Sequence, residues 1–173
     1  MSVTILSGPI GAGKTTVARE LLALLPAPVS YIEGDTFWSF VAKAHSRDQR
    51  EVFRVIMRAM TAAAIPFARS GYEVILDFSI PPQFLETAHK ILKEVPLNYI
   101  VLRPSLEVCA ARAASRSEGG IANYGSYQEF YALFEDASPY VVSDDEADAR
   151  SVAKRIHQGL GEGRFGVAVH CDP

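Results

Sequence analysis

A glycine-rich loop near the start of the chain limits its possible folds more than any other segment. The loop, Gly8-Pro9-Ile10-Gly11-Ala12-Gly13-Lys14-Thr15, fits the pattern G-x-x-x-x-G-K-[ST], whose backbone N–H groups turn inward around phosphate oxygens. An apolar run at residues 3–7 precedes it and a helical pattern at residues 14–25 follows, as this motif requires. The pattern therefore predicts a nucleoside triphosphate site, formed by Gly8, Gly11, Ala12, Gly13, Lys14, Thr15 and Thr16.

Two side chains of the loop carry specific expectations. Lys14 is expected to reach the β- and γ-phosphates and to assist catalysis, and the Thr15 hydroxyl is expected to ligate Mg²⁺. The positive end of the following helix adds to the field that attracts phosphate. The sequence thus predicts Mg²⁺ together with a nucleoside triphosphate.

Short apolar runs alternate with helical stretches along the rest of the chain, which is typical of α/β proteins with a parallel sheet. Strands are expected at residues 3–7, 29–33, 73–77, 98–102 and 141–142. Helices are expected at residues 14–25, 47–69, 81–95, 105–116, 126–136 and 147–160. We therefore expect a three-layer sandwich with a five-stranded parallel sheet.

Several local details of these elements are also predicted. On the helix at 47–69, one apolar face should contain Val52, Val55, Ile56, Ala59 and Ala63. The run from Ser126 to Glu129 fits a capping box that would start a helix. Residues 1–160 should form one domain with a lid at about 112–126, followed by a tail at 161–173 in which 165–169 is an extra strand or disordered.

Composition excludes several classes of protein. Hydrophobic residues make up 49% and charged residues 21%, with a net charge of −3, so neither nucleic acid nor a membrane is an expected partner. Two isolated cysteines, no basic leader and no apolar run of roughly 18 residues favour a soluble cytoplasmic protein. We expect a monomer or a homodimer that binds a small-molecule acceptor.

Missing motifs narrow the class of nucleotide-binding protein. The chain has no N-K-x-D or T-K-x-D segment, the signature that recognises guanine, and no Asp followed three residues later by Gly. Its nearest approach to an ABC transporter signature, at residues 117–120, lacks the Leu-Ser start. These absences argue against GTPases and transporter ATPases and leave a small-molecule kinase as the main hypothesis.

Two acidic residues lie at the carboxyl ends of predicted strands, the edge where ligands bind in open α/β sheets. Asp35 is placed to accept the proton of an attacking substrate hydroxyl, although an Asp there also suits a helix cap. Asp77 ends the run Val74-Ile75-Leu76, an arrangement that holds Mg²⁺ directly or through water. Either acid could be the base, and this choice stays open from sequence alone.

Basic and aromatic residues suggest how the phosphates and the acceptor are held. Arg112 and Arg116 share one helix face beside the predicted lid, where they would neutralise charge during phosphoryl transfer. Phe37 and Trp38 could wall a ring-shaped acceptor. A stripe of arginines on the next helix either attracts an anionic acceptor or is simply solvated: Arg47, Arg50, Arg54 and Arg58.

Taken together, these motifs resemble the nucleoside-monophosphate-kinase-like branch of phosphate-loop kinases, especially gluconate kinase, shikimate kinase and chloramphenicol phosphotransferase. The resemblance covers residues 3–160 and rests on Gly8 to Thr16, on Glu33-Gly34-Asp35-x-Phe37-Trp38, on Val74 to Asp77, and on Leu102-Arg103-Pro104 with the two arginines that follow. It implies the strand order 2-3-1-4-5, Asp35 as the contact of the substrate hydroxyl, and residues 143–148 near adenine.

The chain also departs from its relatives. The acid pair D-x-D and the triple-glycine segment of shikimate kinases are missing, so no acceptor is named by the resemblance. The main hypothesis is an ATP-dependent phosphotransferase acting on a small-molecule hydroxyl. The alternatives are a nucleotide-dependent regulator without efficient kinase activity and a toxin-like kinase of sugar nucleotides.

Overall fold

The computed structural model of the 173-residue chain describes residues 1–43, 48–115, 123–143, 145 and 147–168. Its strands are β1 (Val3–Ser7), β2 (Val29–Glu33), β3 (Glu73–Asp77), β4 (Leu97–Leu102) and β5 (Val141–Val142). Its α-helices are α1 (Lys14–Leu22), α2 (Gln49–Arg69), α3 (Leu85–Leu92), α4 (Leu106–Ala114), α5 (Gln128–Ala132) and α6 (Ala149–Gly161). Three short 3₁₀ turns are η1 (Gly34–Phe40), η2 (Pro82–Phe84) and η3 (Tyr124–Tyr127).

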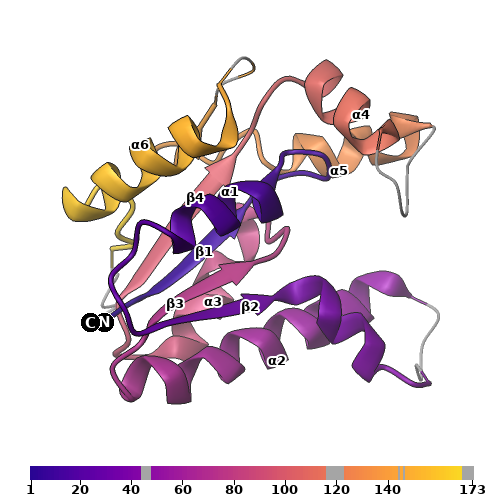
Figure 1. Cartoon of the computed structure of the whole chain (residues 1–173). Coiled ribbons are helices and arrows are strands. Elements are labelled where there is room, and N and C mark those ends of the chain that lie inside the picture. The colour runs from indigo at the N-terminus through magenta and orange to yellow at the C-terminus, as the bar shows by residue number, and fades with distance from the viewer. Residues whose placement is uncertain (44–47, 116–122, 144, 146, 169–173) are drawn as a thin grey trace.

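The five strands form one parallel sheet in the order β2-β3-β1-β4-β5, which confirms the predicted topology. Helices cover both faces: α1 and α6 lie on one side, and α2 and α3 on the other (Figure 1). Because all strands run the same way, their carboxyl ends meet at one edge, where α4 and α5 also lie (Figure 1). The expected three-layer sandwich is therefore present.

Each face of the sheet has its own hydrophobic core. Successive residues of a strand point to opposite faces, so Val3 and Ile5 pack against α2 and α3, whereas Leu6 packs against α1 and α6. The same alternation places Ile75 and Asp77 of β3 on the α1 side. This register matters because it directs the last acid of β3 toward the first turn of α1.

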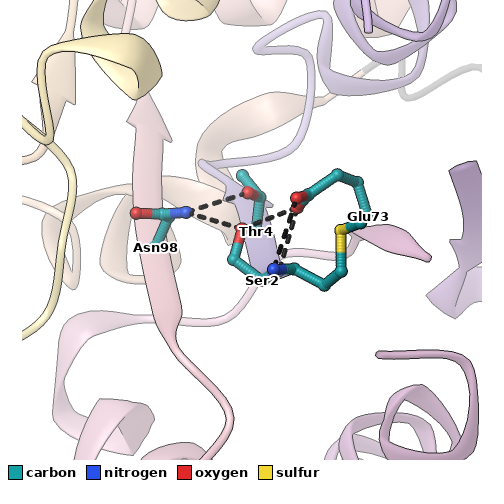
Figure 2. A network of polar contacts seen from close by, with 5 residues as sticks. Ser2, Thr4, Glu73 and Asn98 are labelled. Carbon is teal, nitrogen blue, oxygen red and sulfur yellow. Dashed lines mark hydrogen bonds and ion pairs between the residues drawn. The ribbon is translucent and has the colours of Figure 1, made fainter. Parts of the chain in front are cut away.

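A polar network joins the amino ends of three neighbouring strands, at the edge opposite the glycine-rich loop (Figure 2). The backbone N–H and hydroxyl of Ser2 donate to Glu73 Oε2 at 2.9 and 2.8 Å. Asn98 Nδ2 donates to the hydroxyls of Ser2 and Thr4 at 3.1 and 3.4 Å. These bonds link β1, β3 and β4 through their side chains, so the network has a structural role.

The predicted apolar face of α2 is wrong in part. Val55 is 59% exposed and Ala59 is also exposed, while the buried face contains Ile56, Met57, Met60, Thr61, Ala64 and Ala68. The helix contains alanines on several of its sides, so helical periodicity alone does not identify the buried face. That face contains both methionines, whose larger apolar side chains gain more free energy on burial than alanine does.

Two further expectations need correction. Ser126 lies inside η3, so it does not begin a helix; α5 starts at Gln128, and its N-cap Tyr127 makes no side-chain bond. In the tail, the described residues 165–168 form no extra strand: Phe165 is fully buried and Gly166 makes an isolated antiparallel bridge with Asn98 of β4, while Val169 lies outside the described residues. Among the described residues, no helix is both long and apolar enough to cross a membrane.

Candidate functional site

The glycine-rich loop follows β1 and curls tightly because three of its glycines adopt positive φ angles: Gly8 (142°), Gly11 (82°) and Gly13 (87°). Two of them also touch other backbone segments. A Cβ on Gly8 would lie 2.2 Å from the carbonyl oxygen of Leu102, and one on Gly11 would lie 2.1 Å from that of Cys109. Only glycine fits where β4 and α4 approach this closely, so the loop is built into the fold.

Two side chains donate hydrogen bonds to carbonyls of the loop, one from the loop itself and one from a distant segment. Lys14 Nζ donates to the carbonyls of Gly8 and Pro9 at 3.2 and 3.1 Å, which holds the ammonium over the loop. The hydroxyl of Tyr124, in η3, donates to the carbonyl of Ile10 at 2.6 Å. The loop therefore keeps its shape through contacts with a segment more than a hundred residues away in the chain.

Asp77, at the end of β3, accepts two hydrogen bonds on the same oxygen. The Thr15 hydroxyl donates to Oδ2 at 2.8 Å, and the Tyr31 hydroxyl donates to it at 2.9 Å. Asp77 is only 4% exposed, so the carboxylate depends on these donors. Burial, and then the Asp77 charge, raise the pKa of Tyr31 well above its ordinary value, so the phenol stays protonated as a donor at neutral pH.

This pair of oxygen ligands fits Mg²⁺. Magnesium in nucleotide sites usually binds one or two protein oxygens, and phosphates and water complete its shell. Thr15 and Asp77 bring a hydroxyl and a carboxylate within 2.8 Å of each other beside the loop. The described residues contain no cluster of three or more His, Cys, Asp or Glu suited to a metal.

Asp35 lies on the same edge of the sheet as Asp77. Glu33 pairs with Asp77 in the parallel register, and Asp35 follows two residues later in η1, with its side chain exposed. Within the described part of the chain, its carboxylate accepts no hydrogen bond. Next to it, Trp38 is 39% exposed and Phe40 is 72% exposed, so aromatic surface faces solvent beside this acid.

Arg112 is the arginine that the structure brings to the loop. Its Nη1 would be the nearest neighbour of a Cβ added to Gly13, at 3.7 Å. Together with Gly13, Thr16, Asp148 and Val152 it lines a cavity of about 250 Å³ between α1, α4 and the start of α6. Arg116 and residues 116–122 of the predicted lid lie outside the described residues, so both stay predictions.

The other residues singled out in the sequence are less closely tied to the site. Arg50, Arg54 and Arg58 are exposed on α2, and Arg47 lies outside the described residues. Cys109, one of the two cysteines, is fully buried, and desolvation raises the pKa of its thiol to about 11. Such a thiol stays protonated and is a poor nucleophile at neutral pH.

Sequence reasoning missed Tyr31 and Tyr124. Tyr31 belongs to an ordinary apolar strand, and no motif marks it. In the sheet, Tyr31 pairs with Ile75 of β3. Its hydrogen-bond partner Asp77 lies two residues farther along β3, on the same face of the sheet. Only the pairing of β2 with β3 shows this contact. Tyr124 follows Asn123 in a segment without periodicity, so nothing in the sequence links it to Ile10.

Comparisons with known proteins place the chain in a family and show what its fold resembles. A family model described as an AAA domain matches residues 3–129. No curated protein is a significant sequence match to the chain. Many solved structures share its fold, and the likeness to phosphate-loop kinases that the motifs predicted is confirmed at that level.

Three of these structures illustrate the likeness. The tunicamycin resistance protein of Deinococcus radiodurans is 20% identical, with 92% of this chain and 95% of that chain covered and a TM-score of 0.72. The APS kinase of Mycobacterium tuberculosis, solved with AMPPNP and APS, is 18% identical over 92% and 97%, with a TM-score of 0.70. A sugar kinase from a Janibacter species is 19% identical over 93% and 95%, with a TM-score of 0.68.

Proposed function

The chain belongs to the AAA domain family, and from that premise we propose that it is an ATP-dependent kinase that transfers the γ-phosphate to a hydroxyl of a small molecule. The observation that carries the proposal is the contact of Thr15 with Asp77 at 2.8 Å beside the glycine-rich loop. It provides oxygen ligands for Mg²⁺ where the phosphates would lie. Bound Mg²⁺ would neutralise charge on the β- and γ-phosphates.

The two acids receive different roles in this proposal. Asp77 already accepts hydrogen bonds from Thr15 and Tyr31, and its position beside the loop suits it to hold the cation. Asp35 is exposed at the edge of the sheet and accepts no hydrogen bond from any described residue, so it is available to a substrate hydroxyl. We therefore assign Asp35 as the general base, and Lys14 and Arg112 as the groups that stabilise the transferring phosphoryl group.

The cavity beside the loop is assigned to the nucleoside part of ATP. Its volume of about 250 Å³ lies below the roughly 300–1,000 Å³ of complete ligand pockets, in line with the phosphates lying outside it, along the loop. The acceptor would bind on the other side of the phosphates, near Asp35 and the exposed rings of Trp38 and Phe40. This surface suits an acceptor with a ring or another apolar face.

The first test is a search for the acceptor. The purified protein is incubated with Mg²⁺ and ATP and with pools of sugars, nucleosides, nucleotide sugars and antibiotics, and mass spectrometry detects the gain of a phosphoryl group. A phosphorylated product supports the proposal. If no pool yields a product and the nucleotide instead controls capture of a protein partner, the kinase proposal fails and the regulatory alternative replaces it.

With an acceptor in hand, the substitution Asp35→Asn tests the base. We expect kcat to fall by about 10²–10⁴-fold, because proton transfer by a positioned base contributes that much, while the affinity for an ATP analogue stays unchanged. Glu94→Gln is the matched control, since it removes one exposed carboxylate just before β4, at the opposite edge of the sheet. Full turnover by the Asp35→Asn enzyme would transfer the role of base to another group.

A further inference from the structure

The hydroxyl of Tyr31 reaches Asp77 because of the register between two strands. Tyr31 pairs with Ile75, and Asp77 lies two residues farther along β3 on the same face of the sheet. The ring therefore extends diagonally toward the carboxyl edge, and its hydroxyl donates to Oδ2 at 2.9 Å. Tyr31 is half-buried and packs against the hydrophobic core on the α1 side of the sheet.

The two donors to Asp77 are not equivalent. In the proposed site the Thr15 hydroxyl is also a ligand of Mg²⁺: its oxygen would bind the cation through a lone pair, while its proton is donated to Asp77. The bond from Thr15 is therefore part of the metal site itself. Tyr31 lies on a different strand and makes no contact with the loop among the hydrogen bonds described, so its bond to Asp77 is independent of the phosphates.

We propose that Tyr31 is a positioning residue for the magnesium site: its hydroxyl fixes the Asp77 carboxylate by occupying Oδ2, so that Oδ1 is presented to the cation or to its water. The inference rests on the proposed function only for the presence of Mg²⁺ and nucleotide, and not on the identity of the acceptor. A group that orients a metal-binding carboxylate commonly changes metal affinity by about 10–100-fold when it is removed.

The test is a comparison of nucleotide binding with and without the cation in the whole chain. The affinity of a non-hydrolysable ATP analogue is measured by calorimetry in excess chelator and then across a Mg²⁺ titration, for the wild type and for Tyr31→Phe. We expect Tyr31→Phe to bind the analogue normally in chelator, because the loop is intact. It should need about tenfold more Mg²⁺ to reach the same gain in affinity.

Tyr99→Phe is the matched control, since Tyr99 is a buried tyrosine whose hydroxyl donates to the backbone carbonyl of Ile80 at 2.6 Å rather than to Asp77. It should lower the melting temperature without altering the Mg²⁺ requirement. A purely structural role for Tyr31 predicts instead that Tyr31→Phe weakens binding equally in chelator and in Mg²⁺. That result, or an unchanged Mg²⁺ requirement, would overturn the inference.

A double variant tests whether the effect passes through Asp77. Asp77→Asn alone should raise the Mg²⁺ requirement, and adding Tyr31→Phe should change it little further, because effects of residues that act together are not additive. If the two effects multiply, Tyr31 acts by another route and the proposal is wrong. Wild-type protein that binds the analogue without any Mg²⁺ dependence would refute both this inference and the proposed function, whereas a normal wild type with an insensitive Tyr31→Phe refutes this inference alone.

Discussion

Among single residues, Asp77 is held by hydroxyls from two different elements, Thr15 at the start of α1 and Tyr31 in β2. Asp35, two residues beyond Glu33, the register partner of Asp77, is exposed. Both acids lie at the carboxyl ends of strands, and either could serve as a base on that ground alone. Their surroundings separate them, because a buried carboxylate must be paired while an exposed one can be free for a ligand.

Gly11 allows a direct test of the shape of the loop. In Gly11→Ala the new Cβ would lie 2.1 Å from the carbonyl oxygen of Cys109, at a φ of +82° that alanine rarely adopts. Left-handed strain alone costs about 1–2 kcal/mol, and displacement of α4 adds to it. We expect the melting temperature to fall by about 5–10 °C, given roughly 2–4 °C per kcal/mol for a domain of this size, together with loss of nucleotide binding.

Gly161→Ala is the control for this experiment. Gly161 is the last residue of α6, and an added Cβ meets no atom within 4 Å. Alanine favours helix by up to about 1 kcal/mol over glycine, so the melting temperature should stay the same or rise slightly. If Gly11→Ala melts like Gly161→Ala and still binds the nucleotide, the close packing of the loop on α4 is not required.

Within the elements, the ends of helices depend on capping side chains that short-range patterns identify only in part. Ser105 caps α4, and its hydroxyl accepts from the N–H of Val108 at 3.4 Å. At α6 the cap is Asp148, one residue inside the expected start at 147, and it accepts from the N–H of Ser151 at 2.9 Å. Asp148 also lines the cavity, so the same side chain caps α6 and forms part of the cavity wall.

The Asp148 cap should make the stability of the protein depend on pH. Hydrogen bonds from the backbone and side chain of Ser151 hold the pKa of Asp148 below its ordinary 3.8. A lowered pKa in the folded state stabilises the fold above pH 3.8, and this gain is lost as the pH falls through the folded value. Asp148→Ala should therefore lower the melting temperature at neutral pH, and the gap to the wild type should shrink as the pH falls below 3.8.

Ser105→Ala separates the loss of a cap from the titration of a carboxylate. Its hydroxyl does not titrate in this range, so the destabilisation it causes should not vary with pH. Thermal melts followed by circular dichroism, with no nucleotide present, measure both variants. If the difference in melting temperature between Asp148→Ala and the wild type stays constant with pH, the charge of Asp148 contributes nothing to stability.

Across the whole molecule, the sheet order brings together segments that are distant in the chain. β1 lies between β3 and β4, so the loop after β1 meets Asp77 on one side and α4 on the other. Tyr124 and Arg112 complete the surroundings from the second half of the chain. The residues of the proposed nucleotide site thus come from both halves of the chain, and nucleotide binding should stabilise the fold as a unit.

This arrangement predicts a thermal shift on nucleotide binding. At a concentration 100 times its dissociation constant, a ligand that binds only the folded state adds about 2.7 kcal/mol of stability. For a domain of this size, that corresponds to an increase in melting temperature of about 5–10 °C with Mg²⁺ and an ATP analogue. Lys14→Ala should abolish the shift; a shift of equal size in that variant would place the nucleotide elsewhere.

Local sequence patterns predicted the glycine-rich loop, the five strands and the edge of the sheet at which the acids lie. A phosphate-binding loop and alternating β and α segments are short-range features, so they can be read from neighbouring residues. They were not enough for the buried face of α2, where alanines on several sides leave the periodicity ambiguous, or for the start of α5. Phe165 and Tyr124 show the same limit, since their partners are far away in the chain.

The chemistry of the site divides in the same way. Roles for Lys14, Thr15, Asp35 and Asp77 could be proposed from motif and position, because each lies at the end of a strand or at the start of a helix. That Tyr31 joins Thr15 on one oxygen of Asp77 depends on the register of β2 against β3 and on the packing of α1 over both. Register is set by contacts between strands distant in sequence, which is why that hydroxyl could be assigned a role only once the strands were paired.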